Sequence, residues 1–147
     1  MPQFNRQRKE MVDLLRERGI TDSKVLATFA SVDRHLFVPR AFQGRAYDDC
    51  ALPIGCSQTI SQPYTVAFMT ACLNVQKGDK VLEVGTGSGY QAAILAEMGA
   101  RVFSIERHAE LLMEARKVFE KLHYDVATKV GDGTVGWESL LPSMGLS

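Results

Sequence analysis

The sequence lacks a surplus of charge of either sign, since its 147 residues include 17 lysines and arginines against 17 aspartates and glutamates. Proteins that bind duplex nucleic acid usually carry a basic excess, so this balance predicts a chain that binds no nucleic acid. The sequence also lacks an apolar run near the roughly 20 residues of a membrane-spanning helix. Its polar first ten residues are not typical of a signal peptide. We therefore expect no membrane association.

Cysteine is scarce, with only three residues in the chain and no C-x-x-C spacing. An odd number of scattered cysteines is typical of reduced thiols, so we expect a cytoplasmic protein. The three histidines have no metal-like spacing with other ligands, so we expect no metal site. A chain of 147 residues has the size of one compact domain.

Charge is absent altogether from Ala51 to Gln76. The second half of this run, Tyr64 to Val75, is apolar on every side, which predicts a buried helix. Ahead of the run, Arg8 to Arg18 predicts a helix that ends at Gly19. Thr21 and Asp22 are candidate N-caps of a second helix.

Strands and helices alternate in the second half of the chain. Apolar runs predict strands at Lys80–Val84, Arg101–Ile105 and Ala127–Val130. Helical periodicity occupies Tyr90–Met98 and His108–Leu122 between them. The β-α-β-α-β order predicts an α/β fold with a parallel sheet and right-handed crossovers.

A glycine-rich turn follows the first of these strands. It reads Glu83-Val84-Gly85-Thr86-Gly87-Ser88-Gly89-Tyr90. Glycines allow a tight strand-to-helix turn and close approach of the backbone to a ligand. The nicotinamide fingerprint needs glycine at the sixth position, where this chain has Tyr90, so a nicotinamide oxidoreductase is the most distant alternative. The G-x-G-x-G form is the one that methyltransferases use, although a simple tight turn is the structural alternative.

Acidic residues follow the next two strands. Glu106 ends the second strand, where a carboxylate suits a ribose diol, or else it is a solvated charge favoured by a helix dipole. Asp132, between Gly131 and Gly133, suits an adenine amino group, or else it caps a turn. Ligands of open α/β sheets bind beyond the carboxyl ends of the strands, where all these residues gather.

The glycine turn, Glu106 and Gly131–Gly133 resemble the three cofactor segments of the protein-L-isoaspartate O-methyltransferases. The segments Leu52–Gly55 and Gln58–Tyr64 are more specific, because they resemble a loop that other methyltransferases lack. The resemblance runs from about the second helix to Trp137. It implies a Rossmann-like fold dependent on S-adenosylmethionine. Residues 1–76 would be a helical and substrate-loop region packed on a cofactor-binding part, residues 77–147.

The family transfers a methyl group from S-adenosylmethionine to the α-carboxylate of L-isoaspartyl residues in damaged proteins, so the resemblance implies isoaspartyl peptides and proteins as partners. By resemblance Ser61 is the catalytic residue, and Ser57 stands where many members have glycine. The residues implied in cofactor binding are Thr59, Ile60, Gln62, Tyr64, Glu83, Gly85, Thr86, Gly87, Ser88, Gly89, Glu106, Arg107, Asp132 and Gly133.

Chemistry favours a charge-free substrate loop for such a reaction. A carboxylate with a pKa near about 3.9 is already ionised at neutral pH and needs no general base. A cation gripping it would stabilise the ground state more than the transition state, so neutral donors and alignment serve better. Ser61 would orient the carboxylate by a hydrogen bond. The alternative is that Ser61 caps the helix that has Pro63 in its first turn.

Members of the family continue past Gly133 into a fourth strand, whereas this chain has only Thr134 to Ser147. We therefore expect a fold that is incomplete at its C-terminus, with Lys80–Val84 as an exposed edge strand. Such an edge allows self-association of a chain otherwise expected to be a monomer. We also expect weak or no catalysis. The alternatives are a catalytically silent cofactor-binding module and a methyltransferase for another substrate.

Overall fold

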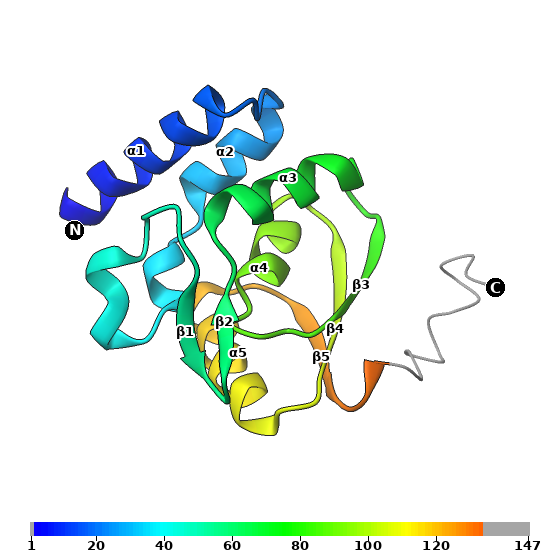
Figure 1. The fold of residues 1–147 in the computed structure, drawn as a ribbon. Helices are drawn as coiled ribbons and strands as arrows, with labels where there is room; N and C mark the ends of the chain where they lie inside the picture. Colours follow the sequence, from blue (N-terminus) through cyan, green and yellow to red (C-terminus); the bar gives the residue numbers. More distant parts are fainter. Residues whose placement is uncertain (1, 134–147) are drawn as a thin grey trace.

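The computed structural model describes residues 2–133 of the chain (Figure 1). The end of the resemblance at Trp137 and the expectations for residues 134–147 lie outside this range.

Two helices, α1 (Pro2–Glu17) and α2 (Ser23–Ser31), lie together at one end of the molecule (Figure 1). The first begins earlier than the predicted Arg8 and ends near Gly19, which has a φ of 103°. Asp22 is the N-cap of α2, and its side chain accepts hydrogen bonds from the Lys24 and Val25 amides at 2.9 and 3.3 Å. The prediction is thus confirmed for Asp22 and not for Thr21. Two 3-10 helices follow, η1 (Arg34–Phe37) and η2 (Arg40–Arg45).

An antiparallel hairpin occupies the first half of the charge-free run. Its strands are β1 (Leu52–Gly55) and β2 (Gln58–Ile60), with Leu52 opposite Ile60. The sequence analysis missed this hairpin because strands of four and three residues are too short to show an alternating pattern. The turn between them has left-handed backbone at Cys56 (φ 51°) and Ser57 (φ 56°). The backbone at both residues therefore adopts a conformation that favours glycine.

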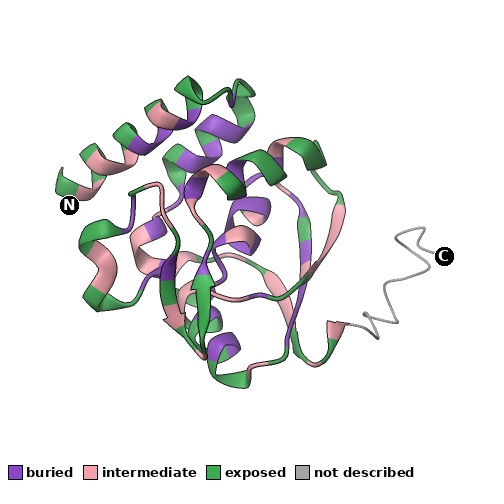
Figure 2. Cartoon of the chain, in the orientation of Figure 1, coloured by how far each residue is buried: buried purple, intermediate pink, exposed green. Residues whose placement is uncertain are grey.

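Helix α3 (Pro63–Leu73) confirms the helix predicted in the second half of the run, with Pro63 in its first turn. The prediction that it is buried all round is wrong, because Phe68, Met69 and Leu73 are 44%, 56% and 54% exposed. One side of α3 contacts α1 and α2. Its other side lies toward the edge of the sheet, where no strand of residues 2–133 covers it (Figure 2).

The sheet is parallel, as the sequence predicted, and its strands stand in the order β3-β4-β5. Its strands are β3 (Lys80–Val84), β4 (Arg101–Glu106) and β5 (Val126–Val130), joined by α4 (Tyr90–Glu97) and α5 (Ala109–Leu122). Val81, Val102 and Val126 stand in register and pack against the hydrophobic core.

Within the described residues β3 is an edge strand, as expected, and Val84 at its end is 62% exposed. The carboxyl ends of all three parallel strands open at the same edge of the sheet. The hairpin β1–β2 and the start of α3 lie beside that edge (Figure 1). This arrangement brings Ser61 of the charge-free run next to the glycine turn, although Ser61 and Gly85 are 24 positions apart in the chain.

The strained turn yields a stability prediction. We expect Ser57→Gly to raise the free energy of unfolding by about 0.5–1 kcal/mol. A left-handed residue with a Cβ costs roughly 1–2 kcal/mol, of which the greater unfolded-state freedom of glycine removes about 0.5–1 kcal/mol. Urea unfolding measures the difference. The matched change Ser31→Gly, in helix α2, should lower stability instead, and equal effects of the two substitutions would contradict the argument.

Candidate functional site

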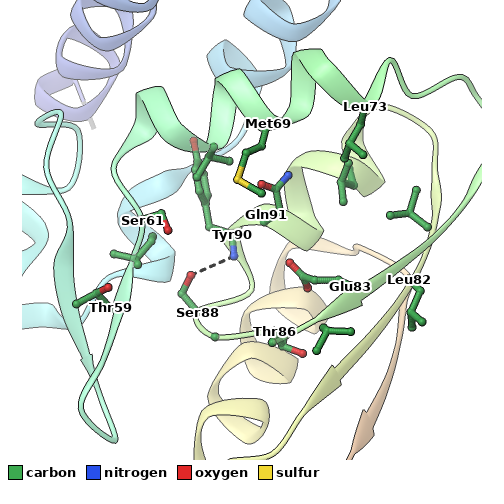
Figure 3. A pocket seen from close by; sticks show the side chains of 17 residues that line it. Thr59, Ser61, Met69, Leu73, Leu82, Glu83, Thr86, Ser88, Tyr90 and Gln91 are labelled. Atoms are coloured by element: carbon green, nitrogen blue, oxygen red, sulfur yellow. Dashed lines mark hydrogen bonds between the residues drawn. The ribbon is translucent and has the colours of Figure 1, made fainter. Parts of the chain in front are cut away.

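A cavity of about 390 Å³ lies between the glycine turn and the segment that joins the hairpin to α3 (Figure 3). Strand β3 and helix α3 form its remaining walls. Predicted site residues that line it are Thr59, Ile60, Ser61, Glu83, Gly85, Thr86, Gly87 and Ser88. The structure therefore brings the two halves of the predicted site, which are distant in sequence, to one cavity.

The glycines of the turn have different structural roles. Gly85, Gly87 and Gly89 all have left-handed backbone, with φ values of 91°, 54° and 92°. A Cβ added to Gly85 would meet nothing within 4 Å, so the space before it is open. A Cβ added to Gly89 would stand 2.8 Å from the ring of Phe119 in α5. Gly89 is therefore also required for packing, while Gly85 leaves room for a ligand.

Local hydrogen bonds turn the chain from β3 into α4. The Gly89 amide donates to the Thr86 carbonyl at 2.9 Å. The Tyr90 amide donates to the Ser88 hydroxyl at 3.2 Å, a bond drawn in Figure 3. These bonds satisfy amides at the start of the helix, which intrahelical carbonyls cannot reach.

Glu106 points at the glycine turn, as its place at the end of the second strand predicted. Its Oε1 accepts the Gly87 amide and its Oε2 accepts the His108 amide, both at 2.9 Å. The residue is only 4% exposed, so these two bonds compensate a buried carboxylate. Each carboxylate oxygen has a further lone pair, and the acid can accept additional hydroxyl donors while it holds the turn.

Glu83 belongs to a second polar network on the wall of the cavity. The Ser104 hydroxyl donates to the Glu83 carboxylate at 2.6 Å and also bonds the hydroxyl of the buried Thr86. The pKa of Glu83 is raised from 4.5 to about 7, chiefly by burial; the Ser104 hydrogen bond lowers the pKa and the charge of Glu106 raises it. The carboxyl is thus poised between its two charge states near neutral pH.

Ser61 reaches the cavity from the segment before α3, opposite the glycine turn (Figure 3). The alternative that Ser61 caps α3 is wrong, because Gln62 occupies the N-cap position. The Tyr64 amide in the first turn of α3 instead donates a hydrogen bond to the Asp49 carboxylate at 2.9 Å. The Ser61 hydroxyl makes no hydrogen bond within residues 2–133, so it is available to a ligand.

Other predicted cofactor residues stand outside the cavity lining. The Gln62 side chain donates to Asp49 at 3.4 Å, and the Tyr64 ring lies under the guanidinium of Arg18 at 4.1 Å. The other predicted residues outside the lining are Gly89 in the turn and, at the strand ends, Glu106, Arg107, Asp132 and Gly133. Their roles in binding stay predictions.

The structure adds lining residues that the sequence analysis did not select. Met69 and Leu73 of α3 and Leu82 of β3 form an apolar wall. Tyr90 and Gln91 begin α4, and the Gln91 amide group donates to the Thr70 hydroxyl at 3.0 Å. A position directly after the glycine turn was the available signal for Tyr90 and Gln91. No sequence signal identified the face of α3 that turns to the cavity.

The described residues contain neither a candidate metal site nor a helix that could span a membrane. Among residues 2–133 no group of three or more histidine, cysteine, aspartate and glutamate residues is arranged to hold a metal ion. Within the same range no helix combines the length and the apolar character that crossing a membrane requires.

The sequence of this chain matches a known protein family. The sequence model of the family described as protein-L-isoaspartate(D-aspartate) O-methyltransferase (PCMT) matches residues 6–143. The chain belongs to this family. The match includes the hairpin, the glycine turn and Glu106, so the resemblance inferred from these motifs is confirmed for nearly the whole chain.

Relatives in the family are similar along almost all of this chain. A protein-L-isoaspartate O-methyltransferase of Salinibacter ruber is 58% identical over 143 residues, which is 97% of this chain and 62% of the relative. One of Dictyoglomus thermophilum is 49% identical over 142 residues, which is 96% of this chain and 64% of the relative. The chain therefore spans somewhat less than two thirds of the length of these relatives.

Solved structures of the family share the fold. A protein-L-isoaspartate O-methyltransferase superposes with a TM-score of 0.77 at 27% identity, covering 86% of this chain and 42% of that protein. A Plasmodium falciparum protein described as a member of the same class, solved with S-adenosyl-L-homocysteine, gives a TM-score of 0.68 at 27% identity. This superposition covers 82% of this chain and 60% of the Plasmodium falciparum chain. The Rossmann-like α/β fold predicted from the motifs is confirmed.

The raised pKa of Glu83 yields a prediction for this PCMT family member. Because the pKa in the folded state lies above the ordinary 4.5, the stabilisation is complete below pH 4.5 and is lost as pH rises through about 7. A shift of this size corresponds to at most about 3 kcal/mol. We expect Glu83→Gln to remove this pH dependence from the free energy of unfolding, measured by urea titration from about pH 4.5 to 8.

The matched control is Glu120→Gln, an exposed acid on α5. Its curve should follow the wild-type curve across the same pH range. If the Glu83→Gln curve also ran parallel to the wild type, the carboxyl would have an ordinary pKa, and the network around Ser104 would not perturb it.

Proposed function

We propose that the chain binds S-adenosylmethionine across Gly85–Gly89 and transfers its methyl group to the α-carboxylate of L-isoaspartyl residues in damaged proteins. One observation carries the proposal: Ser61 and the glycine turn face the same cavity, and the Glu106 carboxylate accepts the Gly87 amide of that turn. Membership of the PCMT family and the S-adenosyl-L-homocysteine complex of the Plasmodium falciparum relative support it.

The residues of the site fit the chemistry of this cofactor. A cavity of about 390 Å³ falls within the range of small-molecule sites, about 300–1,000 Å³. Gly85 offers open space for the methionine part, and Glu106 has acceptor capacity left for the ribose hydroxyls. Glu83 supplies a carboxyl whose ionised form attracts a cationic ligand. When bound, the cofactor supplies a methyl group activated by a positive sulfonium.

The substrate side of the cavity supplies neutral groups. Thr59 and Ser61 offer hydroxyls, and no lysine or arginine is among the described residues that line the cavity. An ionised carboxylate attacking a sulfonium loses charge in the transition state, so a cation at this point would stabilise the ground state more. In this proposal Ser61 donates a hydrogen bond that orients the carboxylate, and the close, aligned approach of the carboxylate to the methyl group accelerates the transfer.

The two parts of the chain have different roles in this proposal. We infer that residues 1–76 supply the substrate loop and residues 77–147 the cofactor site, within one domain. Isoaspartyl-containing peptides and proteins are then the partners, and the cysteine pattern and charge balance favour a cytoplasmic protein that binds neither nucleic acid nor membrane. We expect a monomer in solution, in which the β3 edge of the described sheet could pair with another copy of the chain.

Calorimetry with S-adenosyl-L-homocysteine tests cofactor binding directly. We expect saturable binding of one ligand per chain. Glu106→Gln should weaken it about tenfold or more, since the substitution removes a charge-assisted bond of roughly 1.5–3 kcal/mol. Glu120→Gln, on the exposed face of α5, serves as the control and should leave the affinity unchanged. A folded wild-type chain with no affinity for this ligand would refute the proposal.

Methyl transfer to an isoaspartyl peptide tests the second half of the proposal. We expect label from S-adenosylmethionine to appear in the peptide slowly, in line with the weak catalysis expected above, and Ser61→Ala to lower the rate about 10- to 100-fold further through lost alignment. The corresponding aspartyl peptide should accept no methyl group. Binding without transfer would instead identify a catalytically silent cofactor-binding module, and transfer to other acceptors alone would identify a different substrate class.

A further inference from the structure

Arg34, in the 3-10 helix η1, is a fully buried cation with an exposed fraction of 0%. Among the described residues no carboxylate forms a salt bridge with its guanidinium. Burial of an unpaired charge is costly, and the hydrogen bonds made by the planar fork of donors offset part of that cost.

The guanidinium joins three separate segments of the chain. Nε donates to the Ala46 carbonyl after η2, and Nη2 donates to the Ser61 carbonyl at 3.0 Å. The Cζ atom lies 4.8 Å from the centre of the Tyr90 ring, a cation–π contact. Neither Nη1 nor the Tyr90 hydroxyl has a hydrogen-bond partner among the described residues.

Two of these segments are opposite walls of the cavity. Ser61 belongs to the segment before α3, and Tyr90 is the first residue of α4, directly after the glycine turn. Tyr90 is itself held edge-on by Phe29 and Phe37, with ring centroids 6.0 and 5.6 Å away. Arg34 thus contacts both the Tyr90 ring, which the two phenylalanines hold in place, and the backbone carbonyl of Ser61.

We infer that Arg34 is a positioning residue, which sets the place of the Ser61 hydroxyl relative to the glycine turn through the Ser61 carbonyl. This inference rests on the proposed methyl transfer. A purely stabilising role, in which Arg34 only satisfies the Ala46 and Ser61 carbonyls, predicts a loss of stability with no separate change in kcat, and the control variant below distinguishes the two roles. The planar fork is needed because lysine has no rigid pair of donors that reaches two carbonyls at once.

The test compares Arg34→Met with the wild type in two measurements. Hydrogen exchange reports the amides from β2 to Gln62, and methyl transfer to an isoaspartyl peptide reports alignment. We expect faster exchange in this segment and a kcat about 10- to 100-fold lower. The affinity for S-adenosyl-L-homocysteine should stay unchanged, because Arg34 contacts the turn only through the Tyr90 ring.

Arg8→Met is the matched control. Arg8 also makes a partly buried contact between segments, to Asp33 and to the Tyr47 hydroxyl, but it does not touch Ser61 or Tyr90. Loss of general stability would affect both variants alike, whereas a positioning role changes the loop and kcat only in Arg34→Met. Arg34→Lys keeps the charge and lacks the fork, so it should reproduce the effects of Arg34→Met. It also provides the test if the methionine variant does not fold.

The two measurements separate this inference from the function on which it rests. A wild-type chain that transfers no methyl group refutes the proposed function, and hydrogen exchange then decides on Arg34 alone. Unchanged exchange from β2 to Gln62 in a folded Arg34 variant would overturn the inference. So would changes in exchange and kcat that Arg8→Met reproduces in full.

Discussion

The hydrogen bond from the Gly87 amide to the Glu106 carboxylate joins the two features on which the site depends. A left-handed glycine turn leaves amides that no strand or helix can satisfy, and a buried carboxylate needs donors. The Gly87 amide of the turn donates to the buried Glu106 carboxylate, so the donor and the acceptor satisfy one another. The parallel register of β3 and β4 brings them together, because it places the ends of both strands at one edge of the sheet. The turn is consequently held with its open side, at Gly85, toward the cavity.

Charge is distributed around this cavity in a way that suits a cationic cofactor and an anionic acceptor. Glu83 and Glu106 lie on the side of the sheet, whereas Arg34 lies behind the backbone of Ser61. The surface between them carries hydroxyls and apolar side chains. The buried charges therefore fix the walls of the cavity, while the groups that would touch the reacting atoms remain neutral.

Prediction from the sequence succeeded where a pattern acts locally. The bounds of β3 follow from its apolar run and its flanking turn signals, and the turn follows from three glycines that need positive φ. Prediction failed where long-range contacts decide. The hairpin depends on pairing between Leu52 and Ile60, and the first turn of α3 is capped by Asp49 from another segment. The exposed face of α3 depends on which elements surround it, so its uniform apolar composition was misleading.

The sequence by itself determined the order of strands and helices from Lys80 onward, the glycine turn and the acid after the second strand. These are properties of neighbouring residues, since backbone conformation and periodicity are local, and the family follows from the motifs that they form. Only the tertiary structure decided that Ser61 faces the turn rather than capping a helix, and that Arg34 lies behind it. Both depend on segments some 12 to 27 residues apart in the chain, and their approach follows from burial of the shared core.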